Sequence, residues 1–356
     1  MDRRNFIKVS GTAAALGLTA SSVPGMAAVP GTASQANRTP AVSHALTFNK
    51  GRFKILQITD THFMIGDERC KDVRKNLEEL IRTESPDLII HTGDVMNAGD
   101  RNRTDGEEAM RIVLGWISAF KIPFAVALGN HDGQYELNRS EIFKVVKSIP
   151  NDVNQGVEGI YGDSNDVFTL SAPGEGKPQW VFYLFDSGDT TDLNVVEGRE
   201  YDYVHHDQIG WYRDCSSYFT RLNGGKPVPS IAFQHIPTPE FGYVLRDKLR
   251  IIKGNIGEEP CTPAINSGLM ANFKEMRDVK AIVCGHDHDD DYAAKWKEIF
   301  LIYGRFSGGD TVYNDLKPCG ARVFEFTEGS DSFRSWIRLV GGEKIQDLRF
   351  PEDFNW

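Results

Sequence analysis

Five short apolar runs in this sequence are each followed by side chains that can bind a metal ion. In chain order the candidates are Asp60 and His62, Asp94, Asn130, His235, and His286 with His288. They supply carboxylate oxygens, an amide oxygen and imidazole nitrogens but no thiolate, a set that suits Mn, Fe, Co or Zn and disfavours Cu(I) or an iron–sulfur cluster. Ligand sites in α/β folds gather at the carboxyl ends of strands, so we expect the five segments to converge.

Two pairs of these candidates have the spacing of neighbours on one side of an extended chain. Asp60 and His62 lie two residues apart, as do His286 and His288, so each pair could hold one ion. Asp94 could bridge two ions through its carboxylate. Glycines precede three of the segments, where the chain has to turn sharply and approach an ion or a phosphate closely. These glycines are Gly93, Gly129 and Gly285.

The four-residue motifs 129–132 and 285–288 carry the most specific signal. Gly-Asn-His-Asp and Gly-His-Asp-His each follow an apolar run, and a loop seldom needs those side chains together. Asp-x-His and Gly-Asp are common at strand ends, where a solvated carboxylate is the ordinary explanation. Their order along the chain and their places after strands are what tie them to the stronger motifs.

Strands and helices alternate in the first half of the chain, and this alternation favours parallel pairing. We expect strands at 53–59, 87–91, 123–128, 166–171, 179–186, 229–234 and 279–284, with several more between 300 and 339. We expect helices at 70–84, 107–120, 205–222 and 267–277. The prediction is a single α/β domain in which two packed sheets form a sandwich flanked by helices, and one large sheet remains the open alternative.

The five segments, in this order, resemble the calcineurin-like metallophosphoesterase superfamily over about residues 53–288. The resemblance implies a β-sandwich flanked by helices and a dinuclear metal centre. It assigns Asp60, His62 and His288 to one metal ion and Asn130, His235 and His286 to the other, with Asp94 bridging them. It also makes His131 the catalytic histidine that faces the phosphate.

Three further segments resemble the subgroup described as purple acid phosphatase-like. They are residues 185–189, 207–212 and 265–268. The true purple enzymes have Tyr three residues after the bridging Asp, where this chain has Asn97, and Asp-x-Gly where it has Asp60-Thr61-His62. Because of these departures we expect no tyrosinate-to-iron colour, and the sequence gives no basis for inferring a redox-stable Fe(III).

The function implied is hydrolysis of phosphate esters, with small phosphomonoesters as the expected substrates and two divalent or trivalent metal ions (Fe, Mn or Zn) as cofactors. Two such ions polarise a phosphoryl oxygen and acidify a shared water, whose hydroxide form attacks phosphorus. His131 and Asp94 are the catalytic candidates, and Asn130, His131 and Arg305 are the substrate-binding candidates. Among enzymes, the alternative is a phosphodiesterase or nucleotidase. The choice of substrate is expected to depend on loops 133–165, 188–204 and 240–263. A non-catalytic metal-binding or phosphate-binding protein is the alternative outside them.

Several charged or titratable residues outside the motifs have ordinary interpretations. His44 is assigned to the tail, and His205 and His206 to the surface at the start of a helix. His91 is expected to be a core histidine, with support of a metal ligand as the alternative. Arg305 could reach a substrate phosphate, with a surface salt bridge as the ordinary interpretation. Residues 289–291, all Asp, are expected to form a solvated loop without a third metal.

The first residues predict an export signal. Arg3-Arg4-Asn5-Phe6-Ile7-Lys8, a weakly apolar run and small residues near position 28 resemble a twin-arginine signal over residues 1–28. A tail or linker is expected at 29–45 and the phosphoesterase domain at 46–356. We expect an exported protein, periplasmic or extracellular in a bacterium, without a stable membrane span.

The net charge and the cysteine spacing restrict the possible ligands and cross-links of the chain. A net charge of −10 gives no general attraction to nucleic acid, so positive charge for a phosphorylated substrate must be local. The five cysteines form no Cys-x-x-Cys pair, and their pairing and the oligomeric state are not set by the sequence.

Overall fold

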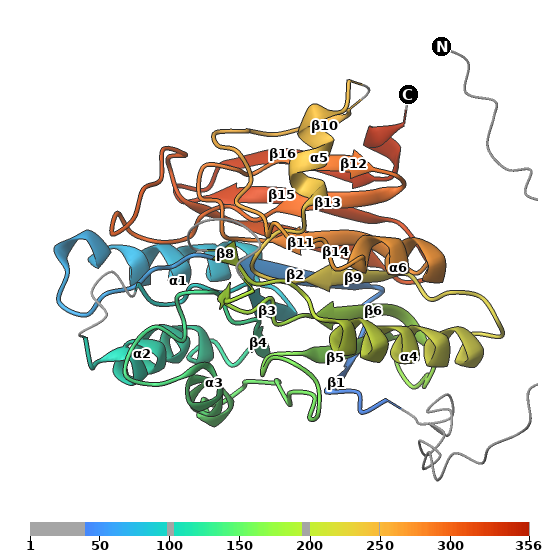
Figure 1. Ribbon diagram of the computed structural model, residues 1–356, viewed down its shortest axis with the longest axis horizontal. Helices are drawn as coiled ribbons and strands as arrows, with labels where there is room; N and C mark the ends of the chain where they lie inside the picture. Colours follow the sequence, from blue (N-terminus) through green and yellow to red (C-terminus); the bar gives the residue numbers. More distant parts are fainter. Residues whose placement is uncertain (1–39, 98–102, 194–199, 249, 356) are drawn as a thin grey trace, which may run out of the picture. The chain divides into compact units, whose positions relative to one another are not determined.

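The computed structural model describes residues 40–97, 103–193, 200–248 and 250–355. Its strands form two large sheets and one small one (Figure 1). The strands are β1 His44–Thr47, β2 Arg52–Ile58, β3 Leu88–His91, β4 Phe124–Val126, β5 Asp166–Ser171, β6 Pro178–Leu184, β7 Thr190–Thr191, β8 Glu200–Tyr201, β9 Ser230–Phe233, β10 Ile252–Lys253, β11 Val279–Cys284, β12 Ala293–Trp296, β13 Ile299–Tyr303, β14 Gly320–Thr327, β15 Phe333–Leu339 and β16 Lys344–Phe350. The helices are α1 Val73–Glu84, α2 Gly106–Ser118, α3 Arg139–Ser148, α4 His206–Leu222, α5 Glu240–Arg246 and α6 Leu269–Met276.

The six-stranded sheet has the order β16-β15-β14-β2-β3-β4, and the eight-stranded sheet has the order β1-β5-β6-β9-β11-β13-β12-β10. The strands that precede the candidate ligands pair in parallel: β2 with β3, β3 with β4, and β9 with β11. Because parallel neighbours end at the same edge of a sheet, β2, β3 and β4 bring their following loops together, as do β9 and β11.

Alternating side chains along the strands separate the core between the sheets from the outer faces. In β2, Ile55 packs between the sheets, whereas Leu56 and Ile58 pack with helices α1, α2 and α3. In β11, Val283 packs between the sheets and Ile282 packs with α4, α5 and α6. Figure 1 shows α1–α3 at the left of the strands and α4 and α6 at the right. The predicted two-sheet sandwich flanked by helices is confirmed.

Eight of the helices and strands lie outside the sequence-based expectations. They are the helices α3 and α5 and the strands β1, β7, β8, β10, β12 and β16. Helix α3 had a readable signal, because Asn138 and Glu141 form a capping box at its start. Strand β1 pairs with β5 from His44 onward, so the assignment of His44 and Ala45 to a tail is wrong. Residues 1–39 lie outside the described part of the chain.

None of the described helices is long and apolar enough to cross a membrane. All five cysteines lie within the described residues and are free.

Candidate metal centre

The loops after β2 and β3 run side by side and carry the first candidate ligands. The backbone N–H of Asp60 donates to Gly93 O, and that of His62 donates to Asp94 O, each at 3.0 Å. Asp60, His62 and Asp94 have φ of 53°, 42° and 53°, in the left-handed region. The expectation that Asp60 and His62 share one side of an extended chain is therefore wrong, and turns bring them together instead.

One group of candidate ligands consists of Asp60, His62 and His288. Their ligand atoms lie within 4.8 Å of one another, and all three residues are buried. His62 Nε2 is 3.0 Å from His288 Nε2. Asp60 Oδ1 lies 3.8 Å from His62 Nε2 and 3.7 Å from His288 Nε2. Two imidazole nitrogens and a carboxylate oxygen thus surround one position.

A second group consists of Asp94, His235 and His286, also within 4.8 Å and buried. His235 Nε2 lies 2.9 Å from Asn130 Oδ1 and 3.2 Å from His286 Nδ1, so Asn130 belongs to this group as well. His286 and His288 therefore fall into different groups, and the expectation from spacing that they share one ion is wrong. His286 has φ of 81°, so the chain is not extended there.

Asp94 lies between the two groups. Its Oδ2 is 3.3 Å from His235 Nε2 in one group and 3.5 Å from His62 Nε2 in the other. Its Oδ1 accepts the backbone N–H of His131 at 2.8 Å, and this bond fixes the orientation of the carboxylate. The carboxylate thus has the position that a bridging ligand requires.

Two of the histidines form hydrogen bonds through the ring nitrogen that faces away from the ligand groups, which leaves the other ring nitrogen facing the neighbouring ligands. His235 Nδ1 donates to Thr92 O at 2.7 Å, and His288 Nδ1 donates to Tyr313 O at 2.9 Å. In the neutral form of each ring, Nε2 is then the unprotonated atom, and it faces carboxylate, amide or imidazole acceptors. Acceptors facing acceptors repel one another unless a cation lies between them, so this donor set fits metal ions.

The electrostatics of the groups lead to the same conclusion. Burial opposes the charged form of His235, but the carboxylates of Asp94 and Asp60 outweigh it and raise the pKa of His235 to about 9. Burial lowers the pKa of His286 to about 3 and that of His288 to about 4, so both rings are neutral at physiological pH. Burial opposes ionisation of Asp94, yet the neighbouring histidines hold its pKa well below the ordinary value. The carboxylates thus attract positive charge to these positions, and a metal ion would take the place of the proton that Asp94 and Asp60 stabilise on His235.

His131 belongs to neither group. Its Nε2 lies 4.0 Å from Asp94 Oδ2, and its side chain is 30% exposed, whereas those of His62 and His235 are fully buried. Burial lowers its pKa below the ordinary value. His131 is therefore a neutral imidazole beside the centre and is more exposed than the candidate ligands His62 and His235.

Two glycines permit the close approach of the loops. A Cβ at Gly129 would lie 2.2 Å from Asp94 Oδ1. A Cβ at Gly285 would lie 2.0 Å from Thr59 Oγ1 and 2.6 Å from Asp60 Oδ2. Both positions therefore exclude any side chain, as expected from their places before the ligands.

Asp132 and His91 support the ligand loops from behind. The Asp132 carboxylate accepts the backbone N–H groups of Asp94 and Gly129. His91 is buried, its Nδ1 accepts the backbone N–H of Gly93 at 3.2 Å, and its Nε2 lies 3.2 Å from Thr61 Oγ1. Asp132 is the last residue of the 129–132 motif, but the motif alone does not predict this supporting role. His91 combines the two interpretations considered for it, since it is a core histidine that also orients a ligand loop.

Arg305 does not fit either of its expected roles. Its guanidinium is buried, pairs with Asp291 Oδ2 at 2.5 Å and donates to Pro318 O at 2.8 Å. It is therefore neither a surface ion pair nor a group free to bind phosphate. Asp290 and Asp291 are buried as well, so the expected solvated acidic loop is wrong for these two residues.

A third set of candidate ligands, Glu258, Cys261 and Asp287, lies beside the centre. Asp287 already accepts the Cys261 N–H at 3.0 Å and the Tyr303 hydroxyl at 2.5 Å. Glu258 accepts the Tyr313 hydroxyl at 2.9 Å. Because these hydrogen bonds already engage the two carboxylates, we interpret the three residues as a support for the surrounding loops.

The remaining histidines lie away from the ligand groups. His206 is exposed, as expected. His205 is half-buried, because its ring stacks on Tyr161 and Tyr203 and its Nε2 bonds Asp202 Oδ1 at 3.0 Å.

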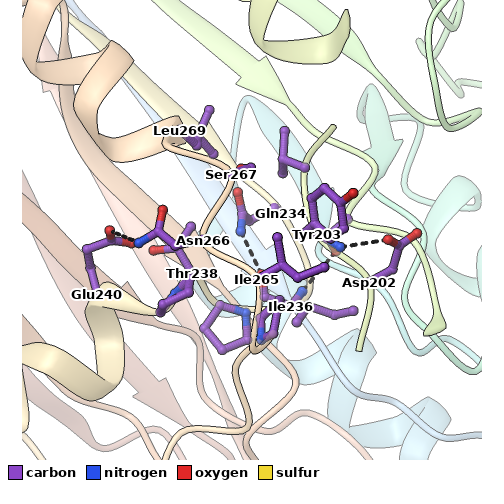
Figure 2. Close-up of a pocket in the computed structure, with 15 residues that line it drawn as sticks. Asp202, Tyr203, Gln234, Ile236, Thr238, Glu240, Ile265, Asn266, Ser267 and Leu269 are labelled. Atoms are coloured by element: carbon purple, nitrogen blue, oxygen red, sulfur yellow. Dashed lines mark hydrogen bonds between the residues drawn. The ribbon is translucent and has the colours of Figure 1, made fainter. Parts of the chain in front are cut away.

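Two tyrosines border the centre, and a small cavity opens next to one of them. The Tyr201 ring stands perpendicular to that of His286 at 4.5 Å, and the exposed Tyr313 ring lies 4.5 Å from that of His288. Figure 2 shows the cavity, which is lined by residues on either side of His235 and by Asp202 and Tyr203, which follow Tyr201.

Comparison with known proteins agrees with this geometry. The model of the calcineurin-like phosphoesterase family matches residues 53–290. The chain is 31% identical over 295 residues to a protein of Arabidopsis thaliana named probable inactive purple acid phosphatase 14, covering 74% of this chain and 72% of that protein. It is 25% identical to phosphatase DCR2 of Saccharomyces cerevisiae, covering 86% of this chain and 57% of that protein. A dimetal phosphatase structure from Danio rerio shares the fold, with a TM-score of 0.58 and 13% identity over 83% of this chain and 98% of that one.

The chain therefore belongs to the calcineurin-like phosphoesterase family and is a metal-dependent phosphoester hydrolase. Within that family its relatives include proteins named as probable inactive purple acid phosphatases.

Proposed function

We propose that this chain hydrolyses phosphomonoesters with two metal ions, one held by each ligand group. The observation that carries the proposal is the position of Asp94, whose Oδ2 lies within 3.5 Å of a histidine nitrogen of both groups. When bound, two such ions polarise the phosphoryl group and acidify water. The name of one relative, phosphatase DCR2 of Saccharomyces cerevisiae, supports the choice of monoesters.

The residues of the chain hold the reacting groups around that centre. Asp94 sets the spacing of the two positions, and Asn130 contributes an uncharged oxygen, so its side of the centre keeps more positive charge for the phosphate than an Asp would leave. His131 lies beside the centre. Its buried Nδ1 has no hydrogen-bond partner, so we place the hydrogen of the neutral ring on Nε2, where it can form a hydrogen bond to a phosphoryl oxygen. Protonation of the departing oxygen by this residue would require the imidazolium form of the ring.

A phosphodiesterase or nucleotidase on the same centre is the second candidate, because the ligands alone do not select the substrate. A non-catalytic metal-binding protein is the third, since three relatives of Arabidopsis thaliana are named probable inactive. Against it, all seven candidate ligands and His131 are present together in this chain, with Asp94 between the groups.

We also propose export of the folded protein, on the basis of the Arg3-Arg4-Asn5-Phe6-Ile7-Lys8 segment. Replacing both arginines by lysine should keep the protein in the cytoplasm of a bacterial host. Unchanged export of that variant would contradict the proposal.

The decisive experiment combines metal analysis with paired assays on p-nitrophenyl phosphate and its bis ester. Two metal ions per chain and faster hydrolysis of the monoester are expected, and Asp94→Asn should remove activity by about 10²-fold or more. His131→Ala should reduce turnover by about 10²–10⁴-fold while both ions stay bound. Preference for the bis ester would favour the phosphodiesterase, and full activity of Asp94→Asn would exclude the two-metal mechanism.

A further inference from the structure

The ring of Tyr313 lies beside the first ligand group and is exposed to solvent. Its centroid is 4.5 Å from that of His288, and the residue is 54% exposed. Of the large hydrophobic residues that the structure describes, only Leu193 is more exposed. A ligand that covers such a ring removes apolar surface from water, which favours binding. Tyr313 therefore offers an apolar contact next to a candidate metal ligand.

The backbone around Tyr313 is attached to both histidines of the first ligand group. Thr311 Oγ1 donates to His62 O at 2.7 Å, and Tyr313 O accepts the N–H of His288 Nδ1 at 2.9 Å. The position of this segment is therefore fixed relative to the candidate metal position. Because the bond to His288 uses the main chain of Tyr313, a replacement of the tyrosine side chain leaves that bond in place.

The Tyr313 side chain is held in one orientation although it is exposed. Its hydroxyl donates to Glu258 Oε2 at 2.9 Å. The other oxygen of this carboxylate, Oε1, accepts the backbone N–H of Asp289 at 2.9 Å, so the carboxylate is itself fixed. A side chain that is already ordered loses little conformational entropy when a ligand binds to it. The ring is thus a preformed surface rather than a freely rotating side chain.

Four rings form a continuous row along the first ligand group. In the order Tyr313, His288, His62 and His131, successive centroids lie 4.5, 4.8 and 5.3 Å apart. The two inner rings belong to buried candidate ligands, whereas the two outer rings are more exposed. Only the His288 ring separates Tyr313 from the candidate metal position. An aromatic ring close to the ester oxygen is therefore short enough to contact Tyr313, whereas the base of a nucleotide lies a ribose farther away.

We propose that Tyr313 binds an aromatic ring in the leaving group, so that the preferred substrates are phosphomonoesters with this ring on the ester oxygen or one carbon from it. The inference rests on the proposed phosphomonoesterase function and names its substrate class. Aromatic pairs gain free energy beyond the burial of their area, so Tyr313 favours an aromatic partner over an aliphatic one of similar size.

The reaction is the hydrolysis of one ester bond. The oxygen of water forms a bond to phosphorus, and the bond between phosphorus and the ester oxygen breaks. The ester oxygen takes a proton. The products are inorganic phosphate and a phenol or an arylmethyl alcohol.

The test compares benzyl phosphate with cyclohexylmethyl phosphate on the metal-loaded full chain. Both esters release a primary alcohol of similar size, and they differ in whether the six-membered ring is aromatic. The wild type should prefer benzyl phosphate by about three- to tenfold in kcat/KM, the range that an aromatic pair contributes. Tyr313→Leu keeps an apolar side chain and should bring the ratio close to one. The change should appear mainly in KM, because the ring contact is made in the bound substrate as well as in the transition state.

Two further variants separate the Tyr313 ring from its hydroxyl and from exposed tyrosines in general. Tyr313→Phe keeps the ring and loses the bond to Glu258, so it should retain about half or more of the wild-type ratio. Tyr243→Leu is the matched control, because Tyr243 lies in α5, is 44% exposed and has its ring 6.5 Å from that of Trp296. This control should keep the wild-type ratio. Bound metal should stay at two ions per chain in all of these variants.

Several results would overturn the inference. Equal kcat/KM values for the two esters in the wild type, or an undiminished preference in Tyr313→Leu, would show that the ring does not contact the leaving group. Loss of metal from Tyr313→Leu with an unchanged ratio would make Tyr313 a purely structural residue. A higher kcat/KM for a nucleoside 5′-monophosphate than for benzyl phosphate would place the aromatic group farther from phosphorus. Tyr313→Gln, which can still donate to Glu258, replaces Tyr313→Leu if that variant fails to fold, and should also bring the ratio close to one.

Failure of the inference and failure of the proposed function give different results. Hydrolysis of p-nitrophenyl phosphate together with equal kcat/KM values for benzyl and cyclohexylmethyl phosphate would remove the aromatic preference and keep the phosphomonoesterase. Hydrolysis of the bis ester without hydrolysis of any monoester would remove the proposed function and the inference with it.

Discussion

The Asp132 carboxylate accepts a hydrogen bond from the backbone N–H of Asp94, with Oδ2 3.0 Å from the nitrogen. The same oxygen accepts the N–H of Gly129 at 2.8 Å, and Oδ1 accepts that of Val95 at 2.9 Å. One side chain therefore ties the loop after β3, which carries the bridging candidate, to the loop after β4, which carries the 130–131 pair.

We predict that Asp132→Asn loosens both loops. The amide can accept through one oxygen only and turns an N–H group toward backbone donors, which should cost about 1–3 kcal/mol of stability. Turnover should fall by about 10–100-fold, because groups that orient metal ligands have effects of that size. Thermal unfolding and bound metal per chain are the measurements, with exposed Asp214→Asn as the control. Normal metal content and turnover in Asp132→Asn would show that the loops hold their positions without it.

A second prediction concerns Gly285. The Cβ of Gly285→Ala would lie 2.0 Å from Thr59 Oγ1 and 2.6 Å from Asp60 Oδ2, so the Asp60 carboxylate or the turn has to move. We expect loss of the ion held by Asp60, His62 and His288, seen as about one metal ion per chain in elemental analysis. Gly210→Ala in α4 is the matched control, because nothing lies within 4 Å of its added Cβ. That control should gain roughly 0.5–1 kcal/mol from higher helix propensity. Two ions in Gly285→Ala would contradict the prediction.

The sequence predicted which segments meet but not how each ligand is aimed. Apolar runs followed by polar residues place the ligand segments at the ends of β2, β3, β4, β9 and β11. This pattern, together with the alternation of strands and helices, is sufficient to predict that the segments meet. An extended backbone would place Asp60 and His62, and likewise His286 and His288, on one side of the chain as ligands of one ion. The turns at Asp60, His62 and His286 have positive φ instead, and such turns depend on contacts with other loops that spacing does not encode.

Contacts between residues that lie far apart in the sequence could not be predicted either. Arg305 and Asp291 form a buried ion pair, and neither residue type carries a local signal of burial. Asp132 was visible as part of a motif, yet its role depends on where the Asp94 backbone lies in the fold.

The buried pair leads to a third prediction, that Arg305 contributes to stability and does not bind substrate. Arg305→Met leaves the Asp291 carboxylate buried without its cation, which should cost about 3–5 kcal/mol in chemical denaturation. The KM of the folded fraction should stay unchanged. Adding Asp291→Asn should recover part of the loss, and the double-mutant cycle measures the coupling. A raised KM with unchanged stability would restore Arg305 as a phosphate-binding residue.

The last prediction concerns the pH dependence of stability at Asp152. Burial raises the pKa of this carboxyl to about 8 in the folded chain, whereas an exposed Asp titrates near 3.8. Below about pH 4 the group is protonated in both states and costs nothing. Between about pH 4 and 8 the unfolded chain releases the proton while the folded chain keeps it, so stability falls as the pH rises.

Asp152→Asn removes this penalty. The melting temperature of the variant relative to wild type should therefore rise from pH 4 to pH 8, with a gain of about 1 kcal/mol at the upper end once partial exposure is allowed for. Exposed Asp331→Asn should give a flat difference over the same range, and a flat difference for Asp152→Asn would show that its carboxyl titrates normally.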